Sequence, residues 1–295
     1  MVFARHHTSS RGAVVALLAT ILVWGYSWVV MKQALDYAGP LQFAALRYLL
    51  GAASLFVAMA VLRVPLRPPP LAAAALIGLC QTTVFQGLAH SAMLTGGAGQ
   101  VALLSYTMPF WTILLAWPLL HERPQPRHWL GVAVAALGLL CIIEPWQGLG
   151  TWLSTLLAIG GGIGWAAGAV LSKRLFQRHP CSPLNLTAWQ MLLGALPLGL
   201  LALWVPARTI DWSPTFIALL AYAVLLASGL AWWLWSLVLQ RLSATVASIS
   251  SLGVPVVGVL LAWIILGEQP SAWKWLGISL VLIGLCTVNG VFSRR

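Results

Sequence analysis

The sequence is poor in charged residues. Asp, Glu, Lys and Arg together make up 7% of its 295 residues, whereas apolar residues make up 60%. Soluble domains carry about 25% charged residues, so this chain cannot cover a water-facing surface of ordinary polarity. Disordered chains are excluded as well, because they combine low hydrophobicity with high charge. The shortage of charge therefore predicts a protein embedded in a membrane.

Groups that could perform catalysis or bind a metal are also scarce. The chain has five Asp and Glu residues and none lies deep in an apolar run, which argues against an intramembrane aspartyl protease. No His and Glu residues within one apolar run have the spacing of zinc ligands. The four cysteines show no C-x-x-C spacing, so we interpret them as small core residues. We therefore predict neither an enzyme nor a cofactor or metal site.

Long apolar runs account for most of the chain. They cover residues 12–31, 42–62, 71–91, 97–119, 127–145, 151–172, 184–204, 213–237, 243–266 and 273–292. A transmembrane helix needs about 20 apolar residues, whereas a barrel strand needs only about 10. The first run is longer than the apolar region of a signal peptide, so we expect it to be retained. The sequence predicts an all-α integral membrane protein with ten transmembrane helices.

Lys and Arg are distributed unevenly between the two sides of the expected membrane. Of the sixteen, only Lys32, Arg208 and Lys274 fall in segments opposite to the N-terminus, and Arg47 lies within a span. Because cytoplasmic loops carry an excess of Lys and Arg, both termini are predicted to be cytoplasmic at the inner (plasma) membrane. The positive charge that gives the chain its net +11 then lies at the inner leaflet, where it faces anionic lipid. Because lipid accounts for this charge, we expect no nucleic-acid partner.

The two halves of the chain resemble each other. Six residue pairs share one separation of 146 positions: Pro109 and Pro255, Glu122 and Glu268, Pro124 and Pro270, Trp129 and Trp275, Gly131 and Gly277, Gly138 and Gly284. Each half holds five spans, and because five is odd the second half enters the membrane from the opposite side. The sequence predicts two inverted repeats, residues 12–145 and 151–292, around a central substrate site, as in secondary transporters.

Two prolines interrupt spans at equivalent positions of these repeats, Pro109 in the fourth span and Pro255 in the ninth. Proline removes a helical hydrogen bond and kinks the helix. Paired interruptions of this kind point to a binding site in transporters. We expect both prolines to act as hinges, with a purely structural kink as the alternative.

Several motifs resemble those of EamA-type members of the drug/metabolite transporter superfamily. The string Trp24-Gly25-Tyr26-Ser27-Trp28 is similar to the W-G-x-[SN]-aromatic opening of that family, and Arg47-Tyr48-Leu49-Leu50-Gly51-Ala52 is similar to its R-[FY]-x-x-A stretch. Pro109 followed by Glu122-Arg123-Pro124 resembles the P…G-E-x-P ending of each repeat, and Pro255 with Gly267-Glu268-Gln269-Pro270 resembles its second copy. The second copy of the opening departs from the pattern, because only Trp165 persists there.

The resemblance implies a ten-helix exporter of amino acids and related metabolites. It also implies that the first, third, fourth, sixth, eighth and ninth spans surround a central cavity, with the fifth and tenth outside. The tryptophan-rich character is most similar to that of the aromatic amino acid exporters in this family.

Aromatic residues within the spans are the main candidates for the substrate site. Seventeen tryptophans are more than interfacial anchoring requires. Trp24 and Trp165 occupy equivalent places in the two repeats, so we expect them to wall a central site through stacking contacts. Further candidates for the lining are Trp111, Trp235, Tyr106, Gln81, Gln86 and Ser251. Ordinary helix packing is the alternative for each.

Two ionisable residues lie inside the spans, Arg47 and His90. Intramembrane ionisable groups are functional hypotheses by default. His90 is a candidate for the substrate site and for proton coupling, or it is a hydrogen-bonded core histidine. Arg47 serves the site, pairs with Asp36, or extends to the outer interface.

The shortage of deep charge also bears on the substrate. A sugar phosphate would require several Lys or Arg residues, whereas a neutral or zwitterionic molecule with an apolar body fits aromatic walls. We expect export of aromatic and other neutral amino acids by alternating access, with facilitated diffusion favoured over proton coupling. The alternative is a multidrug or organic-cation efflux carrier. The expected partners are the transported amino acid and membrane lipids, and we expect a monomer.

Overall fold

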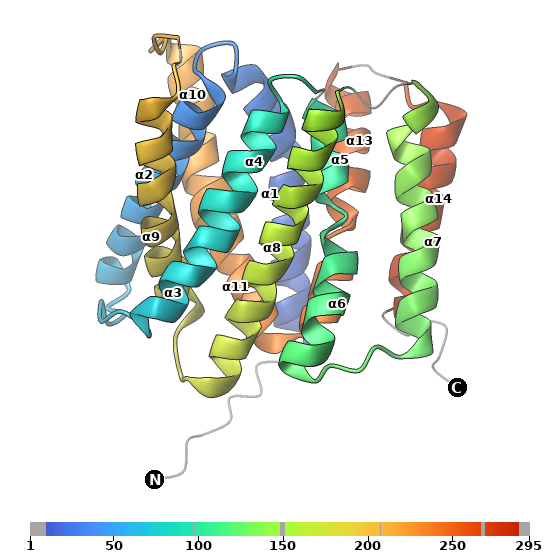
Figure 1. Cartoon of the computed structure of the whole chain (residues 1–295), viewed down its shortest axis with the longest axis horizontal. Helices are drawn as coiled ribbons and strands as arrows, with labels where there is room; N and C mark the ends of the chain where they lie inside the picture. Colours follow the sequence, from blue (N-terminus) through green and yellow to red (C-terminus); the bar gives the residue numbers. More distant parts are fainter. Residues whose placement is uncertain (1–9, 97, 148–150, 207, 267–268, 289–295) are drawn as a thin grey trace.

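The computed structural model describes residues 10–96, 98–147, 151–206, 208–266 and 269–288, and every regular element in these residues is a helix (Figure 1). The first half contains α1 (Ser10–Ala34), α2 (Pro40–Val61), α3 (Leu71–Gly78), η1 (Leu79–Val84), α4 (Phe85–Ala92), α5 (Ala98–Ser105), α6 (Met108–Leu120) and α7 (Pro126–Ile143). A short connection, η2 (Pro145–Gln147), follows. The second half contains α8 (Trp152–Arg178), α9 (Pro183–Trp204), α10 (Pro214–Tyr222), η3 (Ala223–Leu230), α11 (Ala231–Arg241), α12 (Ala244–Ser250), α13 (Gly253–Leu266) and α14 (Ala272–Val288).

The helices have the length and polarity of membrane spans. Within the described residues, nine helical segments are long and apolar enough to cross a membrane. α14 is apolar but shorter, with 17 residues, and it lies where the tenth span is expected. Large apolar side chains such as Leu22, Val57 and Leu200 are exposed on the outside of the bundle, where lipid would cover them. The protein is therefore an all-α integral membrane protein, as predicted.

The two halves form inverted repeats. α1 begins at the end of the bundle where α14 finishes, here called the terminal end, and its counterpart α8 begins at the opposite, distal end (Figure 1). α1 packs against α11 and α13, and α8 packs in the same way against α4 and α6. The two remaining counterpart pairs, α2 with α9 and α7 with α14, pack against each other. The same set of contacts thus occurs twice.

Glycines allow α7 and α14 to approach closely at the side of the bundle. A Cβ atom added to Gly138 would lie 2.7 Å from the carbonyl oxygen of Gly277, and one added to Gly284 would lie 2.6 Å from that of Gly131. Real side chains do not tolerate such distances, so these positions require glycine. The matched glycines of the two repeats therefore serve close helix packing.

The fourth and ninth spans are each divided in two, which refines the prediction of a proline kink. α5 ends at Ser105 and α6 begins at Met108, while α12 ends at Ser250 and α13 begins at Gly253. Each break lies just before the proline, and Pro109 and Pro255 fall in the first turn of the following helix. A first-turn residue has no intrahelical partner for its N–H, so proline is tolerated there. The prolines begin new helices rather than bending continuous ones.

Each repeat also contains a π-helical segment that the sequence analysis did not predict. η1 lies in the third span and η3 at the corresponding place in the eighth. A π-helix shifts the pairing of backbone groups and is frequent at functional sites. In η3 the carbonyl of Ala227 accepts a hydrogen bond of 3.1 Å from the Trp24 indole. The π-helix therefore helps to orient a predicted site residue.

Candidate functional site

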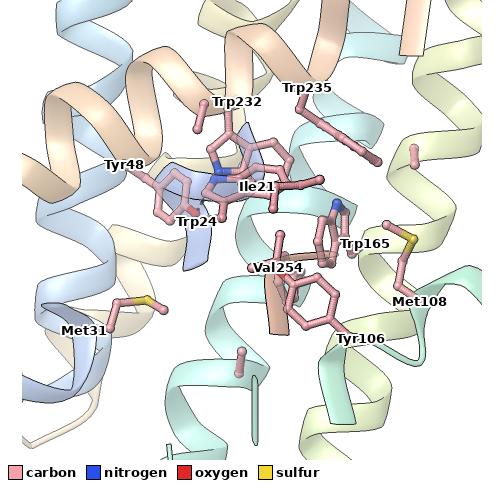
Figure 2. Close-up of a cluster of buried hydrophobic side chains, with 14 of the residues drawn as sticks. Ile21, Trp24, Met31, Tyr48, Tyr106, Met108, Trp165, Trp232, Trp235 and Val254 are labelled. Atoms are coloured by element: carbon pink, nitrogen blue, oxygen red, sulfur yellow. Dashed lines mark hydrogen bonds between the residues drawn. The ribbon is translucent and has the colours of Figure 1, made fainter. Parts of the chain in front are cut away.

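Four tryptophans meet at the centre of the bundle (Figure 2). This tryptophan cluster consists of Trp24 from α1, Trp165 from α8, and Trp232 and Trp235 from α11. The ring centroid of Trp24 lies 5.4 Å from that of Trp165, 5.2 Å from Trp232 and 5.7 Å from Trp235. Such spacings are those of favourable aromatic pairs. The equivalent residues Trp24 and Trp165 thus touch each other edge to face between the repeats.

Hydrogen bonds and stacking fix the orientation of these rings. The indole of Trp24 donates to the Ala227 carbonyl, as described, and the indole of Trp232 donates to the Tyr48 hydroxyl at 3.2 Å. Trp165 stacks on Phe85, with centroids 4.9 Å apart and planes 11° from parallel. The cluster is therefore held by both repeats and by the π-helix η3.

A small cavity of about 30 Å³ lies beside the cluster. Its lining consists of Trp24, Ser27, Trp28, Met31, Arg47, Tyr48, Phe85, Gln86, Tyr106, Trp165 and Trp232. The four lining residues of α1 occupy the part of that helix nearer the distal end, so the cavity extends from the cluster toward that end. A volume of this size holds about two water molecules. An amino acid can enter only if the surrounding rings move apart.

Arg47 places a cationic group in the wall of this cavity. Its side chain is 3% exposed, and its Nε donates a hydrogen bond of 3.0 Å to Ser228 Oγ of η3. Its Cζ lies 4.9 Å from the centre of the Tyr48 ring. Its Nη1 has no hydrogen-bond partner among the described residues. The Arg47 side chain is thus positioned by two neighbours and retains a free donor.

The predicted pair between Arg47 and Asp36 is not formed in this structure. Asp36 is exposed in the connection between α1 and α2, whereas Arg47 points into the bundle toward Ser228. The two charged groups therefore lie apart, one in an exposed connection before α2 and the other inside the bundle. The alternative that Arg47 extends to the interface is also wrong, because its side chain is buried.

The structure brings four of the predicted lining residues together. Trp24, Gln86, Tyr106 and Trp165 all line the cavity. Trp235 lies behind them, fully buried, with its ring 5.9 Å from that of Trp165. It supports the wall of the cavity rather than facing it.

The other candidates lie elsewhere. Trp111 is half-buried and donates to Thr107 Oγ1 at 3.3 Å. His90 is fully buried, with Nδ1 2.9 Å from the Gln86 carbonyl of its own helix. Gln81 and Ser251 are buried outside the cavity lining. In this conformation none of the four faces the cavity.

Several lining residues were missed by the sequence analysis, namely Ser27, Trp28, Met31, Tyr48, Phe85 and Trp232. A signal existed for the α1 residues, because Trp24, Ser27, Trp28 and Met31 follow the 3–4 spacing of one helical face. Trp232 lies three residues before Trp235 on the same helix and could have been found in the same way. No sequence signal singles out Phe85.

A contact between the repeats closes the terminal end of the bundle. Glu122 follows α6 and accepts hydrogen bonds from the backbone N–H groups of Ala244 and Thr245, at 3.1 and 3.2 Å, and from the Thr245 hydroxyl at 3.1 Å. It therefore caps the N-terminus of α12, a helix of the other repeat. Beside it, Lys173 of α8 donates to the Leu242 carbonyl at 2.7 Å.

In the described part of the chain, no three His, Cys, Asp or Glu residues gather in one place. The chemistry that the site offers is non-covalent: aromatic faces, one amide, hydroxyls and one guanidinium. Such a set can bind a small molecule with an apolar body and a few polar groups.

Comparison with known proteins agrees with this architecture. The chain is 31% identical, over 97% of its length and 98% of the relative, to a protein of Salmonella typhimurium named "Probable amino-acid metabolite efflux pump". It is 26% identical to the "Uncharacterized inner membrane transporter YedA" of Escherichia coli K12, over 93% of this chain and 89% of the relative. A solved crystal structure with 19% identity superimposes with a TM-score of 0.82, covering 97% of this chain and 99% of the other, which supports the fold alone.

The model of one protein family matches the chain twice, at residues 11–144 and 152–290. These two matches cover nearly all of the described helices. The chain therefore belongs to the EamA-like transporter family.

Proposed function

We propose that the chain exports neutral amino acids, aromatic ones among them, from the cytoplasm by alternating access. The observation that carries this proposal is the cavity between the repeats, with Trp24, Tyr106 and Trp165 in its wall. Aromatic faces accommodate an apolar side chain and attract an ammonium group. The name of the Salmonella relative, an amino-acid metabolite efflux pump, supports the same substrate class.

The proposed transport cycle uses the two repeats, residues 12–145 and 151–292, as the moving parts. The breaks before Pro109 and Pro255 divide helices that lie next to the central site, so they are suited to act as hinges. Glu122 connects the repeats at the terminal end. We propose that this end faces the cytoplasm, since the basic loops lie there, and that it opens to admit the substrate.

Facilitated diffusion is the proposed mode of transport, carried out by a monomer. The described spans contain no Asp or Glu residue, so a buried carboxylate is not available there as a proton carrier. His90 does not line the cavity and bonds to its own helix. Neither group supplies a proton site next to the substrate.

The proposal is tested by uptake of radiolabelled phenylalanine into proteoliposomes, with and without a pH gradient. We expect saturable uptake that does not respond to the gradient and that is strongly reduced in Trp165→Ala. Trp204→Ala is the matched control, because Trp204 is 84% exposed at the end of α9 and should not affect transport. Loss of uptake in His90→Ala alone, with gradient dependence, would instead show proton coupling. Transport of organic cations without phenylalanine would refute the amino-acid proposal.

A further inference from the structure

Arg47 is a buried cation without an anionic partner among the described residues. It is 3% exposed, it contacts the Ser228 hydroxyl and the Tyr48 ring, and its Nη1 donor has no hydrogen-bond partner there. A guanidinium in an apolar interior is strongly destabilising unless an anion or several acceptors compensate it. Within the membrane region such a group marks a functional site.

The position of Arg47 indicates where the compensating group would come from. The side chain contributes to the wall of the cavity that also contains Trp24 and Tyr106. Ser228 Oγ accepts from Nε and the Tyr48 ring lies against Cζ, so the guanidinium is held in place from two directions. An oriented guanidinium presents N–H donors in a planar fork that matches a carboxylate.

We propose that Arg47 binds the carboxylate of the transported molecule and selects amino acids over aromatic amines. This inference rests on the proposed export of amino acids and assigns the group that recognises their common part. The α-ammonium group meets the aromatic faces and the amide of Gln86, which lines the same cavity. The side chain of the substrate occupies the space that opens when the rings around the cavity move apart.

The same charge excludes the rival class of substrate. An organic cation in this cavity would lie close to a fixed positive charge in surroundings of low polarity, where repulsion between like charges is strong. A molecule with a carboxylate replaces that repulsion with charge-assisted hydrogen bonds. Arg47 therefore acts both by attraction of the correct substrate and by repulsion of the wrong one.

The first test uses the unaltered chain, purified in detergent, and follows quenching of its tryptophan fluorescence by three ligands. L-Phenylalanine carries both charged groups, phenethylamine lacks the carboxylate, and 3-phenylpropionate lacks the amine. We expect phenylalanine to bind most tightly and phenethylamine about 10- to 100-fold more weakly, the usual loss for a hydrogen bond to a charged group. Equal binding of phenethylamine and phenylalanine would overturn the inference without any variant being made.

The second test changes the arginine. Arg47→Gln is expected to bind phenylalanine about 10- to 100-fold more weakly, as in the comparison of ligands, and to bind phenethylamine at least as well as the original chain. Arg47→Lys, which retains the charge but not the planar fork, should lie between the two. Arg178→Gln is the matched control, since Arg178 is exposed at the end of α8, and it should leave all three affinities unchanged. Undiminished phenylalanine binding by a folded Arg47→Gln chain would overturn the inference.

The ligand set separates failure of this inference from failure of the proposed function. If phenylalanine does not bind but 3-phenylpropionate binds in an Arg47-dependent manner, amino-acid export is refuted and the role of Arg47 stands. If phenylalanine binds and is transported independently of Arg47, the export proposal stands and the role of Arg47 is refuted. Binding of phenethylamine alone refutes both.

Discussion

Removal of the Glu122 carboxylate should open the terminal end of the bundle. In Glu122→Ala, the N–H groups of Ala244 and Thr245 lose their acceptor, and α12 loses an anion at its N-terminus. Ser243 remains as the N-cap of α12, so the cost is that of losing hydrogen bonds to a charged acceptor, about 1.5–3 kcal/mol. Because Glu122 belongs to one repeat and α12 to the other, we assign about 2 kcal/mol to the closed state alone. That energy corresponds to about a 30-fold shift toward the state open at this end.

Amide hydrogen exchange distinguishes opening from local fraying. If the repeats separate, exchange should accelerate by about this factor both in α12 and in the last turn of α6, which faces it. Glu122→Gln retains one acceptor oxygen and should show a smaller acceleration. Ser243→Ala is the matched control, because the Ser243 hydroxyl accepts from the Val246 N–H within its own repeat and its loss should affect only the first turn of α12. Faster exchange confined to the first turn of α12 would refute the assignment of Glu122 as a contact that closes this end.

Two further substitutions test the packing that positions the site. Gly138→Val would place a Cβ 2.7 Å from the Gly277 carbonyl oxygen and force α7 and α14 apart. We expect this to lower the free energy of unfolding, measured by denaturation in detergent, by about 1–3 kcal/mol. An unchanged stability would contradict the close contact. Trp24→Phe removes the indole donor to the Ala227 carbonyl, and the loss of this hydrogen bond should lower stability by about 0.5–1.5 kcal/mol. A loss no larger than that of Trp204→Phe would show that this hydrogen bond is unimportant.

The sequence predicted the arrangement of the helices well because the membrane imposes simple requirements. Runs of apolar residues bounded by charge, Pro or Gly correspond to the observed spans to within a few residues, except where a span carries an extra turn, as α8 does in continuing to Arg178. The matched glycines of α7 and α14 revealed the repeat in the sequence, and the structure shows that they also allow close packing of the two helices. These features follow from local composition, which a single sequence displays directly.

The site was predicted less completely because it depends on how distant helices face one another. Trp24 and Trp165 were identified through the repeat, yet Phe85, which stacks on Trp165, gave no signal. Arg47 was recognised as an unusual buried charge, but its partner was sought in Asp36, close in sequence, rather than in Ser228 of η3. The π-helices were missed altogether, since a shift of backbone pairing leaves no periodic pattern in the side chains.

The symmetry of the helices does not extend to the chemistry of the site. Arg47 and Gln190 occupy equivalent places, 143 positions apart, as do Ser27 and Gly168, 141 positions apart. Both Arg47 and Gln190 are buried, but only Arg47 lines the cavity on the distal side. If the repeats exchanged their arrangements, a cavity would therefore form on the terminal side of the same tryptophans. In that cavity the amide of Gln190 would take the place that the guanidinium of Arg47 has in the present one. Because the carboxylate would then lose its charged partner, the two sides of the transporter should differ in affinity even when transport requires no coupling ion.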